Sequence, residues 1–261
     1  MALVAWILES DVFPNSHDAL REAIMDAGHR IIDSSDDWWL HEPPEFEPGT
    51  PIVFHGSLGN AAVIEMKQIW HPGSFCPVND FCCTAWYPRT NRWLLHERWI
   101  CLPANELIAN AADIAAELGC TNQLFVRPDS PLKPFSGRVL DVTAISLRAL
   151  DHGFYYEDET LPVIAARVAD VGREWRFVVV EGLIVAGSGY DTEARKLAEE
   201  IATSMEPPAA VYVLDICKVG DDYRLLELNP FGGADLYDCD ASAIVEAVSK
   251  YADRYCRAHK H

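Results

Sequence analysis

The sequence VYVLDICKVGDDYRLLELNPFGGADLY, residues 211–237, decides the fold of this chain of 261 residues. It consists of two apolar runs separated by Gly220, Asp221 and Asp222, and a loop interrupted by proline and glycine follows. Apolar runs bounded by turn residues in this way predict a β-hairpin. A three-residue loop at 220–222 would set the register of its two strands.

Three oxygen-bearing side chains interrupt this apolar hairpin: Asp215, Glu227 and Asn229. With a three-residue loop, Asp215 lies directly opposite Glu227, with side chains roughly 5 Å apart. Asn229 shares that face because strand side chains alternate. Such an all-oxygen set favours a bound Mg²⁺, whereas the alternative is a solvated hairpin with Asn229 as a helix cap. The prediction depends on the loop length, since a one-residue slip moves Asp215 to the opposite face.

The composition is that of an ordinary globular protein, with 49% hydrophobic and 23% charged residues. A formal net charge of -19 argues against nucleic acid as a partner, because phosphate backbones are bound by clustered Lys and Arg. This charge fits a basic protein partner or simply a soluble surface.

Neither a targeting segment nor a metal-binding cysteine pattern is evident. The N-terminal sequence MALVAWILESD lacks the basic region of a signal peptide, and no apolar run is long enough to span a membrane. We therefore expect a cytoplasmic protein. The eight cysteines contain no CxxC pair, so neither a zinc site nor a disulfide framework is predicted.

The first half of the chain predicts an α/β layer. A buried strand over Leu3–Glu9, a helix over Asp18–Ala27 capped by Ser16, and a strand over Arg30–Asp33 form a β-α-β start. The further predicted elements are a strand at 51–55, a helix at 60–70, irregular structure at 71–99 and a helix at 103–118. The main domain boundary is predicted near Cys120, giving an N-terminal domain at 1–120 and a second domain at 121–261.

The second half alternates strands and helices ahead of the hairpin. The predicted elements are strands at 123–127 and 161–168, a hairpin of 174–180 with 183–186, and helices at 141–150 (or from a cap at Thr143), 191–204 and 241–258.

The loop from Arg127 to Arg138 carries residues suited to phosphate. Arg127 ends an apolar strand and Lys133 lies among prolines, while Ser136 and Gly137 allow a ligand to approach the backbone. An exposed loop with ordinary surface charges is the alternative, and it is the stronger interpretation for Lys133 taken alone.

Arg167 and Arg176 are further basic residues at apolar strand positions, and Glu174 shares the face of Arg176 two residues away. Positive charge placed in this way indicates an anionic ligand. Internal salt bridges to Asp215 or Glu227 are the structural alternative.

Together these stretches resemble the ATP-grasp superfamily. FVRPDSPLKPFSG resembles its basic strand and phosphate-covering loop, VIAARV its adenine hinge, VGREWRFVVVEGLIVAGSGY its G-x-E hairpin, and residues 211–237 its metal-binding hairpin. The resemblance covers roughly residues 120–261, and it is greatest to a divergent branch of stand-alone phage and bacterial proteins related to a eukaryotic translation-initiation assembly chaperone. Arg127 stands where classical members have a lysine.

The resemblance implies an α/β (α+β) ATP-grasp fold with a preceding α/β domain, in which ATP lies between two sheets. The phosphate-loop and hinge part would be 121–170 and the metal-binding part 171–261. Adenine would lie against Ala165, Ala166, Arg167 and Val168, with Glu174 shaping the adenine pocket or the phosphate site. Phosphates would be bound by Arg127, Lys133, Arg167, Ser136 and Gly137, and Mg²⁺ by Asp215, Glu227 and Asn229. Arg176, with Arg167, would stabilise the transferring phosphoryl group.

Substrate contacts are expected from side chains that flank these motifs in sequence: Ser188, Tyr190, Asp235, Tyr237, His55 and Ser57. Each is equally well explained as an ordinary loop or strand-end residue. The implied activity is a Mg-ATP-dependent carboxylate–amine ligase that forms an amide or peptide bond through an acyl phosphate, with small-molecule, peptide or protein substrates. The alternatives are an ATP-binding assembly factor that ligates nothing and a phosphotransferase.

Overall fold

The computed structural model describes residues 3–37, 43–150 and 158–259. These form two compact units, each described by itself. Unit 1 comprises Met1–Pro77, Arg173–Cys217 and Leu225–His261, and unit 2 comprises Val78–Gly172 and Lys218–Arg224. The contact-based units thus divide the chain differently from the domain boundary predicted near Cys120, which stays a prediction.

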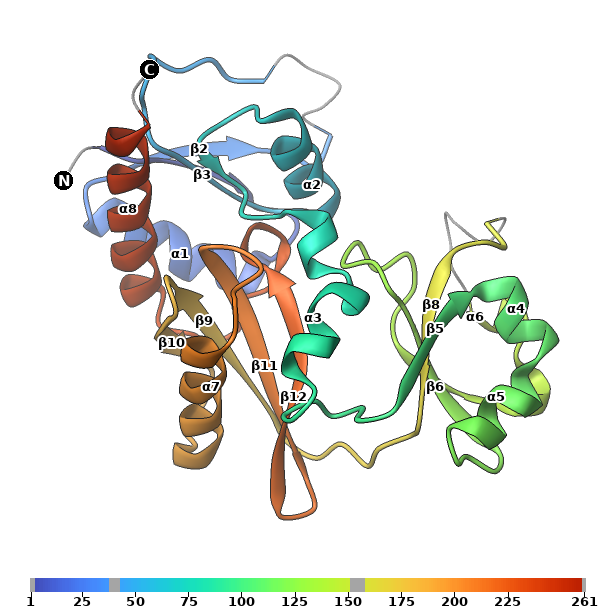
Figure 1. Cartoon of the computed structure of the whole chain (residues 1–261). Helices are drawn as coiled ribbons and strands as arrows, with labels where there is room; N and C mark the ends of the chain where they lie inside the picture. The colour runs from blue at the N-terminus through green and yellow to red at the C-terminus, as the bar shows by residue number, and fades with distance from the viewer. Residues whose placement is uncertain (1–2, 38–42, 151–157, 260–261) are drawn as a thin grey trace. The chain divides into compact units, whose positions relative to one another are not determined.

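Unit 1 begins with the predicted β-α-β layer, a parallel sheet in the order β2-β1-β3-β4 (Figure 1). Its β1 strand is entirely buried, as its apolar sequence AWILE requires. Helix α1 begins with proline and ends before Gly28, whose φ of 72° suits a helix stop. Its elements are β1 (Ala5–Glu9), α1 (Pro14–Asp26), β2 (Arg30–Ser34), β3 (Ile52–His55), α2 (Leu58–Lys67) and β4 (Pro72–Gly73).

The second sheet of unit 1 has the order β10-β9-β11-β12 and contains the hairpin of residues 211–237. Two neighbouring pairs, β9 with β10 and β9 with β11, are antiparallel. The 3-10 turn η5 (Phe231–Gly233) follows β12 directly. The remaining elements are β9 (Glu174–Val180), β10 (Leu183–Gly187), α7 (Thr192–Ser204), β11 (Val211–Val219), β12 (Asp222–Pro230) and α8 (Ala241–Ala258).

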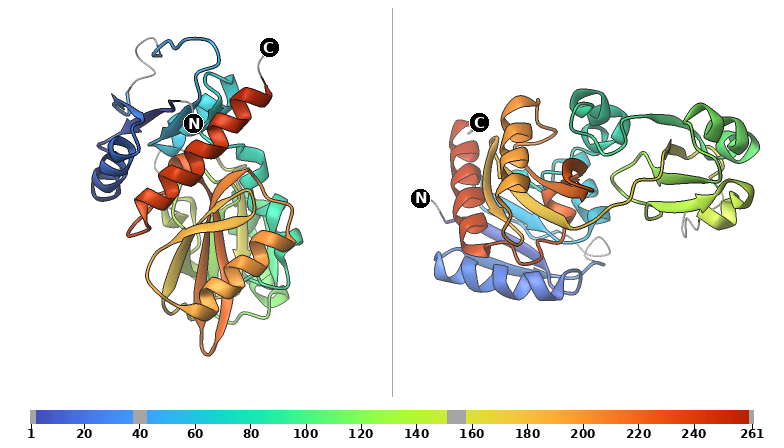
Figure 2. Two further views of the ribbon diagram at one scale, coloured as in Figure 1. Left: turned by 90° about the vertical axis from the view of Figure 1, so that its left-hand side faces the viewer. Right: turned by 90° about the horizontal axis from the view of Figure 1, so that it is seen from below.

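Helix α8 joins the two sheets of unit 1 through one apolar core. Side chains of α8 such as Val245 and Val248 belong to the same buried cluster as Trp6 of β1 and Val213 of β11. Figure 2 shows α8 in red on one side of the second sheet and α7 in orange on the other. Because strand side chains alternate, residues in register with Val213 face α8.

Unit 2 is built on an antiparallel sheet in the order β5-β8-β6-β7. One face packs on α4, α5 and their neighbours through side chains such as Leu124, Val126 and Val163. Its elements are η2 (Val78–Phe81), α3 (Cys83–Thr90), β5 (Trp99–Pro103), α4 (Ala104–Ala109), α5 (Ala111–Glu117), β6 (Gln123–Pro128), β7 (Arg138–Asp141), η3 (Val142–Ala144), α6 (Leu147–Leu150) and β8 (Pro162–Ala166).

Across the three described ranges of the chain, none of the helices combines the length and the apolar character needed to cross a membrane.

Several local predictions are wrong, because contacts distant in sequence decide them. Ser16 is not the cap of α1 but lies inside its first turn and donates a hydrogen bond to Asp235. Segment 71–99 is not irregular throughout, since α3 forms where Asp129 accepts hydrogen bonds from the backbone and hydroxyl of Thr84. No periodicity within 71–99 could reveal that distant cap.

Two predicted helices are also shorter than expected. The helix at 103–118 is divided at Asn110, whose φ of -124° is not helical. The helix at 141–150 is reduced to η3 and α6, and Asp141 rather than Thr143 supplies the cap by accepting from the Thr143 backbone N–H.

Candidate functional site

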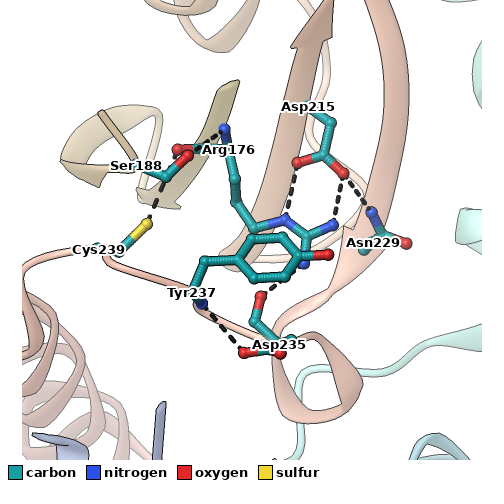
Figure 3. A network of polar contacts seen from close by, with 7 residues as sticks. All are labelled: Arg176, Ser188, Asp215, Asn229, Asp235, Tyr237 and Cys239. Atoms are coloured by element: carbon teal, nitrogen blue, oxygen red, sulfur yellow. Dashed lines mark hydrogen bonds and ion pairs between the residues drawn. The ribbon is translucent and has the colours of Figure 1, made fainter. Parts of the chain in front are cut away.

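An ion pair between Arg176 and Asp215 forms the centre of the polar face of the second sheet in unit 1 (Figure 3). The two residues are directly opposite each other on β9 and β11. Arg176 Nε and Nη2 donate to the two oxygens of Asp215 at 2.8 and 2.7 Å. The side chains are only 11% and 7% exposed, so the pair is nearly removed from water. The internal salt bridge considered for Arg176 is therefore formed.

The third direction of the Arg176 guanidinium is set by the loop after β12. Nη1 donates to the backbone carbonyl of Asp235 at 2.5 Å, and the Tyr237 ring lies 4.5 Å from the guanidinium carbon. Ser188 accepts from the Arg176 backbone N–H at 2.8 Å, and the Ser188 N–H donates to the Arg176 carbonyl. Strand β10 and the loop thus hold both ends of Arg176 (Figure 3).

The hairpin turn is one residue shorter than predicted. Strand β11 ends at Val219 and β12 begins at Asp222, and the positive φ of Gly220 (59°) suits the first position of a two-residue turn. A two-residue turn alone would place Asp215 and Asn229 on opposite faces. Their direct hydrogen bond shows that they share a face, so the register shifts between the turn and Asn229.

Asn229 and Glu227 lie beside the ion pair. Asn229 Nδ2 donates to Asp215 Oδ2 at 3.1 Å, and its amide oxygen points away from Asp215 (Figure 3). Burial, then the charges of Asp215 and Glu227, raise the pKa of Glu174, although Arg176 opposes this. For Arg176 itself, burial lowers the pKa, but hydrogen bonding to Asp215 outweighs it and raises the pKa.

This donor set fits a divalent cation in part. Asn229 presents its amide oxygen and Glu227 a carboxylate, which are suitable ligands for Mg²⁺. Both oxygens of Asp215 are engaged by Arg176, so Asp215 would join a metal only by giving up a hydrogen bond. Among the described residues, no group of three or more His, Cys, Asp or Glu side chains forms a metal site by itself.

The loop that follows Asn229 fills the carboxyl edge of the N-terminal sheet. Gly232 accepts from the Gly56 N–H at 2.8 Å and donates to the Ser74 carbonyl at 3.0 Å. His55 Nε2 donates to the Ala234 carbonyl at 3.0 Å. This edge of a parallel sheet commonly binds ligands. Here the chain's own loop lies there.

His55 and Ser57, both expected near substrate, have other contacts. His55 is fully buried and each of its ring nitrogens has a partner. Ser57 caps α2 by accepting from the Asn60 N–H, and its own N–H donates to the buried carboxylate of Glu9. Of the remaining predicted substrate residues, Ser188, Asp235 and Tyr237 gather around Arg176, while Tyr190 is 89% exposed.

In unit 2, Arg127 occupies the sheet face opposite the helices. Its neighbours Val126 and Leu124 face the helical core, so Arg127 and Phe125 face the other way. A Cβ on Gly137 would lie 2.8 Å from the Phe125 ring, so glycine is required there. Lys133, with a positive φ of 47°, and Ser136 are exposed in the intervening loop.

His96 is a residue of unit 2 that the sequence did not single out. Its Nδ1 donates to the Arg167 carbonyl at 3.1 Å, and its ring stacks on Phe125 with centroids 4.5 Å apart. Burial lowers the pKa of His96 to about 4. The neutral ring thus holds the end of the predicted hinge, where Ala165 and Ala166 are buried and Arg167 is exposed. His96 lies in the segment expected to be irregular, which explains why no pattern marked it.

A family model and solved structures match the chain. The model describes an ATP-grasp domain, family 3 of its clade, and it matches residues 48–248, which is well over half of the sequence. No protein of curated function matches the chain.

Three solved structures show the likeness of fold. D-cycloserine synthetase aligns with a TM-score of 0.63 at 12% identity, over 96% of this chain and all of that chain. D-alanine–D-alanine ligase from Bacillus anthracis aligns with a TM-score of 0.63 at 11% identity, over 98% and 99% of the two chains. An ATP-grasp ligase complexed with its precursor peptide and AMPPNP aligns with a TM-score of 0.53 at 12% identity, over 99% and 97%. Identities this low concern the fold alone.

Proposed function

The chain belongs to this ATP-grasp domain family, and from this membership we propose that it is a Mg-ATP-dependent carboxylate–amine ligase. The observation that carries the proposal is the fixed guanidinium of Arg176, which presents a buried positive charge beside Glu227 and Asn229. A preorganised cation of this kind stabilises charge that develops on a transferring phosphoryl group.

Unit 2 would bind the nucleotide. Arg127 and Lys133 would contact phosphate oxygens, and the backbone at Ser136 and Gly137 would approach them closely. The adenine would lie against the backbone of residues 165–168, whose end His96 holds through the Arg167 carbonyl. Arg167 itself is exposed and would contribute to phosphate binding from the same segment.

Glu227 and Asn229 of unit 1 would hold Mg²⁺, with Asp215 as the third predicted ligand. The ion would neutralise phosphate charge when bound. Asp215 has a second role that needs no metal, because it fixes both Arg176 and the amide of Asn229. Glu174, on the face of Arg176, adds negative charge near this site.

The proposed reaction has two steps. A substrate carboxylate oxygen attacks the γ-phosphorus, the bond to the β-phosphate oxygen breaks, and ADP leaves an acyl phosphate. An amine nitrogen then attacks the acyl carbon, the carbon–oxygen bond to phosphate breaks, and an amide forms as the amine loses a proton. Arg176 would stabilise the anionic oxygens in both steps. Ser188, Asp235 and Tyr237 would line the substrate side, with Tyr190 nearby in sequence.

The printed names of the similar structures suggest which substrates to try first. They are enzymes that act on amino-acid-like molecules and on a precursor peptide. For this chain we propose an amino acid, a peptide or a protein side chain as substrate. The net charge of -19 favours a basic peptide or protein among the amine partners.

The proposal is tested by measuring ADP and phosphate release from Mg-ATP across a matrix of carboxylic acids and amines, with mass spectrometry for the product. Release that requires both an acid and an amine, together with a mass equal to acid plus amine minus water, supports ligation. Release with an acid alone and a stable phosphorylated product would establish a phosphotransferase instead. Tight ATP binding without turnover under any mixture would favour an assembly factor.

A further inference from the structure

A buried pair of histidines, His17 of α1 and His55 of β3, supports the loop that orients Arg176. His17 Nε2 and His55 Nδ1 are 2.9 Å apart, and His55 Nε2 is 3.0 Å from the Ala234 carbonyl. We propose that this pair is a positioning device for Arg176. It makes His17 and His55 positioning residues for the reaction proposed above, on which their catalytic relevance rests.

The hydrogen bonds determine where the protons lie. A carbonyl only accepts, so the proton of His55 is on Nε2, and its Nδ1 is an acceptor when the ring is neutral. His17 must then donate from Nε2, which leaves its Nδ1 without a proton. Within the described part of the chain that Nδ1 is buried and has no hydrogen-bond partner. The whole chain of bonds therefore runs in one direction, from His17 through His55 to Ala234.

The surroundings of the pair keep it uncharged. Burial lowers the pKa of both rings, and the neighbouring His17 lowers that of His55 further. Around His17, the backbone carbonyls of Ser10 and Glu9 and the charge of Asp235 raise its pKa, while Arg21 lowers it. Phe13 and Phe231 pack against the His55 ring and exclude water from it.

The bond at Ala234 acts directly on Arg176, because the adjacent peptide carbonyl is the one that Arg176 binds. Nη1 of Arg176 donates to the Asp235 carbonyl, one residue after the carbonyl held by His55. The carboxylate of Asp235 is fixed in addition by Ser16, the residue before His17, at 2.7 Å. Helix α1 thus holds Asp235 through a hydroxyl and Ala234 through two imidazoles. The guanidinium is fixed on one side by Asp215 and on the other by this assembly.

Steric contacts agree with a closely seated loop. A Cβ on Gly232 would clash with the Ser74 carbonyl oxygen, and one on Gly233 would lie 2.5 Å from Leu58. The loop therefore fills the space at the carboxyl edge of the N-terminal sheet. This edge serves to aim a residue of the second sheet.

The first test needs no variant and no substrate. In ¹⁵N NMR spectra of the whole chain at pH 7, both His17 and His55 should be neutral and protonated at Nε2. A proton on Nδ1 of either ring at pH 7 would overturn the proposed chain of bonds.

The second test follows Arg176 itself. His55→Leu should speed exchange of the Arg176 guanidinium protons with water by roughly five- to tenfold, the effect of about one lost hydrogen bond. His55→Gln, which keeps a donor for Ala234, should show a smaller change. Ser249→Ala is the matched control, because it removes the buried bond from the Trp6 indole in the same unit without touching the loop. Unchanged Arg176 exchange in a folded His55→Leu protein sinks the proposal. If that protein does not fold, the same readout on His55→Gln and His17→Phe decides.

The third test separates a positioning role from a loss of stability. In a double-mutant cycle on kcat for ADP release, or on Mg-AMPPNP affinity if no substrate is found, His55→Leu should cost roughly tenfold in the wild type and little in an Arg176→Lys background. Additive losses would show that His55 does not act through Arg176. Failure of the ligase proposal alone would leave the NMR results as predicted, and so the two proposals fail in different experiments.

Discussion

Arg176 and Asp215 are direct cross-strand partners whose side chains meet through two hydrogen bonds of 2.8 and 2.7 Å at the same position of neighbouring strands. A buried pair of opposite charges is costly to desolvate and costly to break, so it is weak evidence of stability for its own sake. Its value here is that it fixes a cation in one orientation on the face that also carries Glu227 and Asn229.

Asp215→Asn should be more damaging than its small size change suggests. It leaves the Arg176 cation buried without its carboxylate, and we expect a loss of about 3 kcal/mol in the free energy of unfolding. Arg176→Lys, which cannot make the two-pronged contact, should lower turnover by about 10²-fold or more. Arg173→Ala, an exposed arginine at the start of the same region, is the control. Equal losses in Arg173→Ala and Arg176→Lys would contradict the assignment.

Glu227→Gln and Asn229→Ala should each weaken Mg²⁺-dependent ATP binding by about tenfold or more, the effect of losing roughly 1.4 kcal/mol of ligand contact. ATP binding in EDTA should be little affected, because the lost ligand acts through the metal. Titration calorimetry with and without Mg²⁺ measures both values. Asp222→Asn, whose side chain is 74% exposed at the hairpin turn, serves as the control. If neither site variant differs from Asp222→Asn, the metal assignment is wrong.

Arg127→Ala should weaken ATP binding more than Arg138→Ala. Arg127 is 9% exposed at the end of β6, while Arg138 donates to the carbonyls of Ser136 and Ala149 and so has a structural role. A difference of about tenfold in Kd is expected if Arg127 makes a charge-assisted contact to phosphate. Equal losses would mean that positive charge acts only as a diffuse field around unit 2.

Gly232→Ala and Gly59→Ala should shift stability in opposite directions. A methyl at Gly232 clashes with the Ser74 carbonyl, and this backbone atom cannot move without shifting the loop. A methyl at Gly59 meets nothing within 4 Å, and the residue lies in helix α2. We expect Gly232→Ala to cost about 1–3 kcal/mol. Gly59→Ala should add up to roughly 1 kcal/mol, because alanine is the better helix former. Denaturant unfolding measures both, and a neutral Gly232→Ala would refute the close seating of the loop.

Stability should fall when the pH is lowered below 6.5. His55 has a folded pKa of about 3, below the ordinary value of 6.5, and the pKa of His17 is lowered as well. Between these values the unfolded chain binds a proton that the folded chain does not. Acid therefore favours unfolding by up to about 1.4 kcal/mol per pH unit for each such group. The stabilising contribution is fully present above pH 6.5 and is lost as the pH falls towards 3.

The matched variants for this pH dependence are His55→Gln and His259→Gln. His55→Gln should flatten the fall in unfolding free energy between pH 7 and 5, whereas His259→Gln, at an exposed position, should leave it as in the wild type. The raised pKa values of Glu9 and Glu174 act in the opposite sense at lower pH, so the comparison is made above pH 5. An identical slope in His55→Gln and wild type would contradict the neutral pair.

Much of the fold was predictable because it is written in local patterns. The apolar run of β1, the Gly28 stop of α1 and the Glu181-Gly182 turn between β9 and β10 all follow from nearest neighbours in the chain. The errors have a common cause in distant contacts. Asp129 stabilises the start of α3 from 45 residues away, and Ser16 serves Asp235 rather than its own helix.

The sequence by itself determined the family, the order of the elements and the set of polar residues in the hairpin, because motif spacing and strand alternation depend on nearby residues. Only the tertiary structure decided the use of those residues. The hairpin turn is one residue shorter than a three-residue loop, Arg176 engages both oxygens of Asp215, and His55 lies buried against Ala234. These outcomes depend on which side chains meet across strands and between sheets, and that is settled by packing, not by position along the chain.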